Sequence, residues 1–267
     1  MSIAQKIEQE IERCNTLASD WTLPTFLILG AMKSGTTTLH AHLASHPDLF
    51  APHPKELHFF NQHFLKGLPW YAGHFDAAQG RICFETTPAY LFEPDTGYRV
   101  QATLPDAKFL IILRDPVDRC VSHYHHMLRT RRETLPFAEA IGLESSRTDK
   151  LYAQVKTRAL VHSPELKWFS YVRRGHYIDQ LQTWTKLFPK DRFLVLDFQD
   201  LCDSPQSVVD QVTDFLCVPG LRVDSTRQEN AHARGGVSAQ EEAELRDLFA
   251  PYNARLEAYL GRKLSWM

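Results

Sequence analysis

The sequence predicts a three-layer α/β fold in which helices flank a central, mainly parallel β-sheet. Two features of the chain lead to this prediction. Four short apolar runs have the composition of strands that are buried on both faces, and stretches with apolar residues at helical spacing separate each run from the next. Strands that alternate with helices form βαβ units, in which the strands lie parallel.

The expected elements follow from these runs in chain order. Strands are expected at residues 25–29, 81–84, 108–113 and 192–196. Helices are expected at residues 2–16, 35–46, 116–131, 177–188 and 206–216, with mostly helical structure at 135–175. Residues 238–260 are expected to form two helices broken near Pro251, because proline lacks the amide hydrogen that an unbroken helix uses. No repeat or long Gly/Ser linker interrupts the chain, so we expect a single domain over residues 1–267, with a lead-in helix within 1–20 and the C-terminal helices within 238–267.

Composition argues against several classes of protein. Hydrophobic residues make up 43% and charged residues 23% of the 267 residues, as in a globular chain. The net charge of −2, from 30 basic and 32 acidic side chains, argues against a nucleic-acid partner. No apolar run approaches the roughly 20 residues that span a bilayer, and the charged N-terminus does not resemble a signal peptide. The five cysteines have no CxxC spacing, which indicates a reducing compartment, so we expect a cytoplasmic protein without a membrane span.

The segment that follows the first expected strand, from Gly30 to Thr38, has the pattern of a phosphate-binding loop. It connects a buried strand to a helix, so that its backbone N–H groups and the helix N-terminus point toward a common anion. Gly30 and Gly35 permit a tight turn, and Lys33 supplies a cation. A Walker A loop has its lysine directly after the second glycine, where this chain has Thr36. The pattern therefore disfavours an ordinary ATPase or kinase.

Residues 30–37 read Gly-Ala-Met-Lys-Ser-Gly-Thr-Thr. This segment resembles the 5'-phosphosulfate loop of sulfotransferases that use 3'-phosphoadenosine 5'-phosphosulfate (PAPS), in particular the heparan-sulfate type and its bacterial relatives. The resemblance implies a fold like that of P-loop nucleoside triphosphatases, PAPS as the sulfuryl donor, and release of 3',5'-adenosine bisphosphate (PAP). It also implies donor contacts from Lys33, Ser34, Gly35, Thr36, Thr37 and Thr38.

A second segment, residues 113–124, resembles the 3'-phosphate motif of the same family. In that motif an arginine after a strand and a serine on the following helix hold the 3'-phosphate, and Arg114 and Ser122 match these positions. An arginine at the carboxyl end of a parallel strand lies where ligands bind in open α/β sheets, and its guanidinium can bind a phosphate through two hydrogen bonds. Supporting matches are the succession of residues 175–196 and a loop that closes over the nucleotide in the family, here Arg234, Gly235 and Gly236.

A third match supplies candidates for the general base. Residues 55–60 resemble the Lys-Glu-x-His-Phe-Phe segment of the heparan-type enzymes, whose glutamate is taken as the base, and Glu56 matches that glutamate. His58 is the second candidate, because other cytosolic sulfotransferases use a histidine. The heparan-type enzymes carry Glu-Lys-Ser after the next strand, whereas this chain has Glu85 followed by Thr86. Glu85 is therefore a third candidate, either as the base or as a group that orients the acceptor.

These roles define the expected reaction. The sulfuryl group moves by in-line displacement to a hydroxyl or amine, while Lys33 neutralises charge on the bridging oxygen of the leaving phosphate and a base takes the proton of the acceptor. Small molecules, glycans and lipids all fit as acceptors. No metal is expected, since the thirteen histidines form no HExxH pattern. Two alternatives stay open: a P-loop nucleotide kinase, and an inactive relative that keeps the nucleotide-binding fold.

Overall fold

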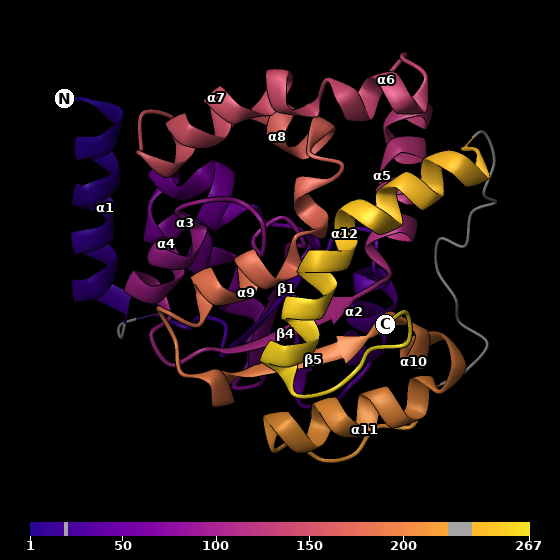
Figure 1. The fold of residues 1–267 in the computed structure, drawn as a ribbon. Coiled ribbons are helices and arrows are strands. Elements are labelled where there is room, and N and C mark those ends of the chain that lie inside the picture. The colour runs from indigo at the N-terminus through magenta and orange to yellow at the C-terminus, as the bar shows by residue number, and fades with distance from the viewer. Residues whose placement is uncertain (19–20, 224–236) are drawn as a thin grey trace.

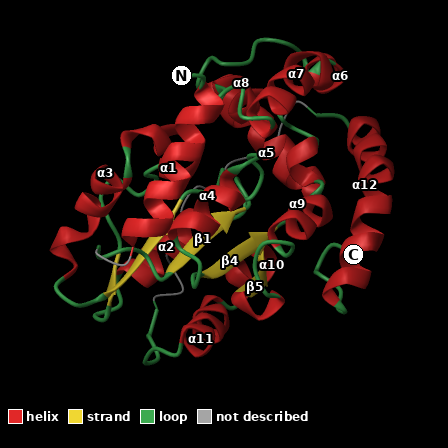
Figure 2. Ribbon diagram, turned by 90° about the vertical axis from the view of Figure 1, so that its left-hand side faces the viewer, coloured by secondary structure: helices red, strands yellow, loops and turns green. Residues whose placement is uncertain are grey.

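The structure is a computed structural model that describes residues 1–18, 21–223 and 237–267. Five strands in the described chain form a parallel sheet in the spatial order β2-β3-β1-β4-β5. They are β1 (Phe26–Gly30), β2 (Leu49–Phe50), β3 (Ile82–Thr86), β4 (Lys108–Leu113) and β5 (Phe193–Asp197). Figures 1 and 2 show the strands in the interior of the molecule with helices around them. The predicted α/β fold with flanking helices is confirmed.

Helices connect and cover these strands. The α-helices are α1 (Ile3–Leu17), α2 (Thr36–Ala44), α3 (Leu68–Ala72), α4 (Thr96–Thr103), α5 (Pro116–Arg129), α6 (Phe137–Gly142), α7 (Glu144–Lys156), α8 (Pro164–Phe169), α9 (Tyr177–Trp184), α10 (Phe198–Asp203), α11 (Pro205–Leu216) and α12 (Ala239–Leu260). Shorter helical turns are η2, a π-helix (Phe59–His63), and the 3₁₀ turns η3 (Phe64–Lys66), η4 (Gly73–Ala78), η5 (Arg173–Gly175) and η6 (Lys190–Arg192). Within the described ranges, no helix is both long and apolar enough to cross a bilayer.

The four expected strands are all present, and their ends lie within two residues of the expected ones. Strand β2 was not expected from the sequence; it pairs with β3 in parallel at the edge of the sheet. A strand of two residues is too short to show any hydrophobic periodicity, so the sequence carried no signal for it.

Alternate residues of β1 face the two helical layers. Phe26 and Ile28 belong to an apolar cluster with side chains of α2, α10 and α11. Leu27 and Leu29 belong to a second cluster with side chains of α1, α4, α9 and α12. All four side chains are buried, as expected for a strand in a sheet that is covered on both faces.

The C-terminal segment corrects one expectation. Residues Ala239–Leu260 form one helix, α12, with Pro251 in its interior, rather than two helices broken near that residue. A proline in a helix interior costs about 3 kcal/mol, through a lost hydrogen bond and a steric clash. Packing of α12 against α5 and α9 offsets this cost, since Leu245, Phe249 and Leu256 are buried on both sides of the proline. The prediction was wrong because tertiary contacts outweigh local propensity here.

The carboxyl ends of three neighbouring strands define the position of the candidate site. Strands β3, β1 and β4 are adjacent and parallel, so the segments that follow them begin at one edge of the sheet. These segments carry Thr87, the loop of residues 31–35 and Arg114. Ligands of open α/β sheets bind at this edge, beyond the carboxyl ends of the strands.

Candidate active site

The loop after β1 ends at Gly35, which is the N-cap residue of α2. Gly35 has a φ of 81°, in the left-handed region, and a Cβ at this position would lie 3.0 Å from the ring of Phe198. Both backbone conformation and space therefore require glycine here. Ser34 is buried before the helix, and Thr36 and Thr38 are buried within its first turn. A glycine turn at a helix N-terminus with hydroxyl-bearing residues beside it is an arrangement that binds phosphate groups.

Cationic side chains surround this loop. Arg114 donates a hydrogen bond from Nη1 to the carbonyl oxygen of Lys33 at 3.3 Å. Burial lowers the pKa of Lys33, the charges of Arg129 and Arg114 lower it further, and Glu56 opposes them. The Nε of Arg114 is buried and has no hydrogen-bond partner within the described part of the chain. Mutually repelling cations and an unused donor fit a ligand with several negative charges.

One face of α5 lies close to the same loop. It carries polar side chains at successive spacings of four, four and three residues, namely Asp118, Ser122, His126 and Arg129. Asp118 Oδ2 lies 3.6 Å from Arg114 Nη2, one helical turn before Ser122. Burial and the charges of Lys33 and Arg129 lower the pKa of His126 to about 4. Of these residues only Ser122 was expected at the site from the sequence; His126 and Arg129, four and seven residues after it, lie on the same face of the helix.

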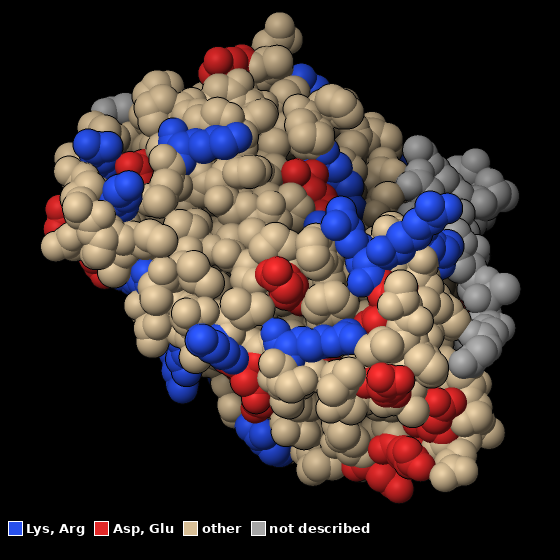
Figure 3. Space-filling view, turned by 90° about the horizontal axis from the view of Figure 1, so that it is seen from above, with Lys and Arg blue, Asp and Glu red and all other residues tan. Residues whose placement is uncertain are grey.

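Basic side chains continue past the C-terminal end of α5. Arg129, Arg131 and Arg132 are exposed there, and the guanidinium of Arg132 lies 4.4 Å from the centre of the Trp168 ring in α8. Figure 3 looks down on this part of the molecule and shows Lys and Arg side chains gathered on the side of α5 and α6. Anionic ligands therefore meet a favourable electrostatic potential as they approach from this side.

Glu56 lies on the segment between β2 and η2, within reach of three basic side chains. Its carboxylate oxygens lie 3.2 Å from His58 Nε2, 3.7 Å from Lys55 Nζ and 3.9 Å from Lys167 Nζ. Burial raises the pKa of Glu56, but the hydrogen bond of His58 and the charges of Lys55 and Lys167 outweigh burial and lower it to about 2. The side chain of Glu56 is 36% exposed, so part of it can be reached from outside the protein. Lys55 also donates a hydrogen bond to Thr37 Oγ1 at 2.9 Å, which joins this segment to the loop after β1.

His58 supports Glu56 from the following turn. Its Nε2 lies against Glu56 and is 3.4 Å from Lys167 Nζ, while its Nδ1 is 3.3 Å from Asn61 Oδ1. Both ring nitrogens therefore have partners within the protein. The residue has φ 54° and ψ 26°, the left-handed conformation, directly before η2.

Glu85 has a different environment, although it lies at the end of the neighbouring strand. Its side chain is fully buried, and three hydroxyl groups donate to its carboxylate. Tyr71 Oη lies 2.6 Å from Oε2, and Thr87 Oγ1 and Tyr90 Oη lie 2.6 and 2.7 Å from Oε1. Burial raises the pKa of Glu85, although these three hydroxyls act in the opposite direction. A carboxylate so enclosed has no oxygen open to an acceptor.

Lys167 is the residue of this constellation that sequence analysis did not find. It lies on α8, and its carbonyl oxygen is 2.9 Å from Nε2 of the fully buried His123 of α5. The contact with His123 holds the backbone of Lys167 in place, and from there the Lys167 side chain reaches Glu56. No local pattern connects residues 55–60 with α8, since the two segments meet only through the tertiary fold.

The expected nucleotide-closing residues Arg234, Gly235 and Gly236 lie outside the described residues. Of the histidines on α2, His40 Nδ1 lies 2.9 Å from Thr86 Oγ1, so it has a partner at the end of β3. Over the described ranges, no three His, Cys, Asp or Glu side chains are grouped so that they could hold a metal ion.

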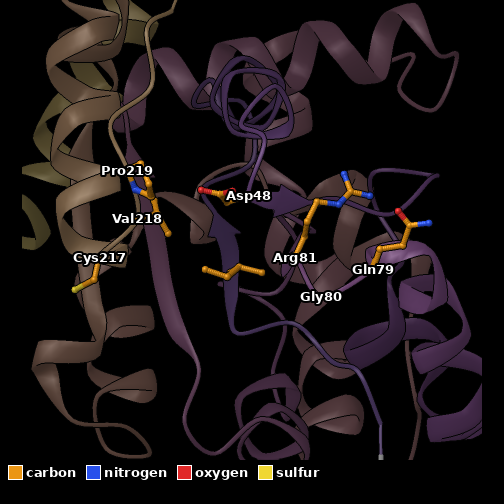
Figure 4. A pocket seen from close by; sticks show the side chains of 8 residues that line it. Asp48, Gln79, Gly80, Arg81, Cys217, Val218 and Pro219 are labelled. Atoms are coloured by element: carbon orange, nitrogen blue, oxygen red, sulfur yellow. The ribbon is translucent and has the colours of Figure 1, made fainter.

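A pocket with a volume of about 360 Å³ lies at the opposite edge of the sheet, before β2 and β3 begin. Asp48, Gln79, Arg81 and Cys217 are among its lining residues. Figure 4 shows that Arg81 extends toward Gln79 and away from Asp48, and that Cys217 lies on the far side. These polar groups do not converge, so the pocket lacks the arrangement of a reaction site.

Comparison with known proteins decides the family of this chain. A family model described as sulfotransferase domain matches residues 23–232, well over half of the chain. The chain belongs to the sulfotransferase domain family. Members of this family are PAPS-dependent enzymes. The matched range contains the loop after β1, the segment of Glu56 and the helix α5 that carries Ser122.

Solved structures of sulfotransferases have the same fold. The crystal structure of a sulfotransferase from Alicyclobacillus acidocaldarius superposes with a TM-score of 0.76 at 33% identity, over 91% of this chain and 98% of that one. The sulfotransferase domain from the curacin biosynthetic pathway superposes with a TM-score of 0.53 at 18% identity, over 91% of this chain and 99% of that one. The second likeness supports the fold alone.

Curated sulfotransferases also align with most of this chain. The membrane-associated sulfotransferase kil1 of Dictyostelium discoideum is 24% identical over 91% of this chain and 66% of its own length. The heparan sulfate glucosamine 3-O-sulfotransferase 3A1 of Mus musculus is 26% identical over 91% of this chain and 64% of its own length. The chain thus spans slightly less than two thirds of the length of these relatives.

Proposed function

We propose that this protein transfers a sulfuryl group from PAPS to a hydroxyl or amine of a small-molecule, glycan or lipid acceptor. One observation supports this most strongly: the phosphate-binding loop and the exposed carboxylate of Glu56 meet at the same edge of the sheet. The hydrogen bond from Lys55 to Thr37 joins the two parts directly. A donor site and a base that are held next to each other meet the geometric requirement of group transfer.

On the donor side, the loop residues Ser34 to Thr38 are proposed to hold the 5'-phosphosulfate through amides and hydroxyls. Lys33 is proposed to neutralise the charge that develops on the leaving phosphate. Arg114, whose buried Nε is unused within the described chain, is proposed to hold the 3'-phosphate together with Ser122. We keep Arg234, Gly235 and Gly236 as proposed nucleotide contacts from the sequence motif alone.

On the acceptor side, Glu56 is the proposed general base. It is ionised and partly exposed, whereas Glu85 is enclosed by hydroxyls and both ring nitrogens of His58 have protein partners. A pKa of about 2 makes Glu56 a weak base in the free protein. An anion bound at the loop adds negative charge close to Lys55, and this raises the pKa of Glu56 toward a more effective range.

We further propose that the enzyme works in the cytoplasm, where thiols stay reduced. All five cysteines lie in described parts of the chain and none of them forms a disulfide. Burial raises the pKa of Cys120 to about 12 and that of Cys14 to about 11, so these thiols are held in their unreactive form.

Calorimetry with PAP, compared with ATP and magnesium, tests the donor assignment. We expect PAP to bind tightly and ATP with magnesium to bind weakly. In Arg114→Ala, the affinity for PAP should fall by about tenfold to a hundredfold, whereas that for adenosine 5'-phosphate, which lacks the 3'-phosphate, should change little. Preference for ATP with magnesium would instead support a kinase, and binding of neither nucleotide would support an inactive relative.

Transfer itself is then measured with ³⁵S-labelled PAPS and a panel of sugars, phenols, alcohols, amines and lipids. Appearance of label in an acceptor, dependent on Glu56, supports the proposed activity. Tight PAP binding with no transfer to any member of such a panel, and no consumption of PAPS, would contradict it.

A further inference from the structure

Two hydroxyl groups connect Glu85 to the segment that follows Glu56. Thr87 Oγ1 lies 2.6 Å from Glu85 Oε1 and also accepts a hydrogen bond from the backbone N–H of His58 at 3.4 Å. Tyr90 Oη lies 2.7 Å from the same carboxylate oxygen and accepts a hydrogen bond from the backbone N–H of Phe60 at 3.3 Å. Each hydroxyl is therefore placed between a buried carboxylate and a backbone amide.

The backbone amides determine the direction of these hydrogen bonds. A hydroxyl has one hydrogen to donate and two lone pairs that accept. Because an amide N–H only donates, Thr87 and Tyr90 direct lone pairs toward the amides of residues 58 and 60 and their hydrogens toward Glu85. Because Glu85 and Tyr90 are fully buried, water cannot replace these partners.

The amide of His58 belongs to a turn that needs support. His58 has the left-handed backbone conformation, with φ 54°, which is disfavoured for a residue with a Cβ. Its carbonyl oxygen accepts from the amides of Gln62 at 2.9 Å and His63 at 3.0 Å, at the start of η2. The carbonyl group of His58 is thus held by hydrogen bonds from η2, and the hydrogen bond to Thr87 holds its N–H group as well.

This turn brings the imidazole of His58 back onto Glu56. The two side chains meet at 3.2 Å between Nε2 and Oε2, although only one residue separates them in the chain. If the backbone of His58 relaxed to an extended conformation, its ring would leave Glu56, and the carboxylate would lose the hydrogen bond that orients it.

We propose that Thr87 and Tyr90, anchored on the buried carboxylate of Glu85, are positioning residues that hold the His58–Phe60 backbone and thereby orient Glu56 for transfer. This inference rests on the proposed function, in which Glu56 is the base. It assigns Glu85 a supporting role: its carboxylate directs two hydroxyls, and these act on the backbone beside the base.

Tyr71 provides an internal control for this proposal. Its hydroxyl donates to Glu85 Oε2 at 2.6 Å, and within the described chain it makes no hydrogen bond to the backbone of residues 58–60. Its ring stacks on Phe59 with centroids 4.3 Å apart, and Tyr71→Phe keeps that ring. Tyr71→Phe therefore removes one donor from Glu85 while it leaves the connection to the His58 turn intact.

The experiment compares Thr87→Val, Thr87→Ser, Tyr90→Phe and Tyr71→Phe with the wild-type protein. For each we measure PAP binding by calorimetry, thermal unfolding, hydrogen exchange of the backbone amides of His58 and Phe60, and kcat with the acceptor identified by the labelled-PAPS panel. Thr87→Val should lower kcat about tenfold or more through misplacement of the base, with PAP affinity unchanged within about twofold. It should also exchange the His58 amide faster.

Tyr90→Phe should accelerate exchange at Phe60 and lower kcat in the same direction, and Thr87→Ser, which keeps the hydroxyl, should restore most of the activity. Tyr71→Phe should lose stability comparable to that of Thr87→Val, yet keep kcat within about twofold and leave exchange at His58 slow. Equal losses of kcat in Thr87→Val and Tyr71→Phe would show that the buried cluster only stabilises the fold. Wild-type exchange at His58 in Thr87→Val would likewise overturn the proposal.

The outcome is distinguishable from failure of the proposed function. If the wild-type protein binds no PAP, the donor assignment fails, and the exchange rates still test whether Thr87 and Tyr90 hold the turn. If the wild-type protein binds PAP and transfers the label while Thr87→Val does so at an equal rate, only the positioning role fails.

Discussion

The surroundings of Glu56 and Glu85 show how one type of side chain acquires two different properties within one site. Glu56 is partly exposed and has His58, Lys55 and Lys167 around it, and its pKa is lowered to about 2. Glu85 is fully buried and has only hydroxyls as partners, and burial raises its pKa. The basic neighbours of Glu56 stabilise its ionised form by charge. The hydroxyls around Glu85 are neutral, and they stabilise its ionised form less.

This difference supports the separate roles proposed for the two carboxylates. A group that takes a proton from an acceptor must be reached by that acceptor, and only Glu56 has exposed surface. A buried carboxylate that accepts hydrogen bonds from three hydroxyls is suited to hold backbone in place. Water cannot reach these hydrogen bonds and replace them. Substitutions of these two residues and of the lysines beside Glu56 test this separation.

Glu56→Gln should lower kcat by about a thousandfold, because the amide cannot accept the proton of the attacking group. The affinity for PAP should change by less than about twofold, since the donor loop keeps its contacts. Steady-state kinetics and calorimetry check the two parts, and Glu139→Gln on the exposed surface of α6 is the matched control. Turnover within about tenfold of wild type would move the base to His58.

Lys33→Ala should lower kcat by about a hundredfold, since a cation that stabilises developing charge contributes several kcal/mol in a dry site. Unlike Glu56→Gln, it should also weaken the binding of PAP. Replacement by arginine keeps the charge but not its shape, and should recover binding better than turnover. Unchanged kcat in Lys33→Ala would show that this residue only lies beside the donor.

Glu85→Ala should act mainly on stability, because it leaves the hydroxyls of Tyr71, Thr87 and Tyr90 buried without their acceptor. We expect the free energy of unfolding to fall by about 3 kcal/mol. Urea denaturation of the wild-type protein and of Glu85→Ala measures this loss. Glu56→Gln is the comparison, and its free energy of unfolding should change by less than about 1 kcal/mol. A larger loss of stability in Glu56→Gln than in Glu85→Ala would break the proposed separation.

Lys167→Met should change the pH dependence of the reaction without abolishing it. The base acts in its ionised form, so kcat/KM falls as the pH drops below the pKa of Glu56. Lys167 is one of the charges that lower this pKa, and its removal should therefore shift the acid limb to higher pH, toward the ordinary range near 4.5. A pH–rate profile records the shift. Lys186→Met, at an exposed lysine just after α9, is the control, and an equal shift there would contradict the assignment.

The sheet and the glycine turn after β1 could be predicted from sequence because their signals are local. Strand β4 is buried on both faces and therefore needs a continuous apolar run. Gly35 has a positive φ, which favours glycine. Where contacts between distant residues matter more than local preference, prediction failed: β2 is too short to carry a pattern, and α12 continues through Pro251 because both of its halves are packed.

The fold class, the glycine turn after β1 and three candidates for the base could all be predicted from the sequence, since each is encoded within a few consecutive residues. The tertiary structure alone decided what surrounds the carboxylates. Lys167 reaches Glu56 from α8, and Tyr71 reaches Glu85 from α3, across stretches of chain that share no pattern. The protonation of a carboxylate depends on charges and donors within a few ångströms in space, and only the folded chain defines which groups those are.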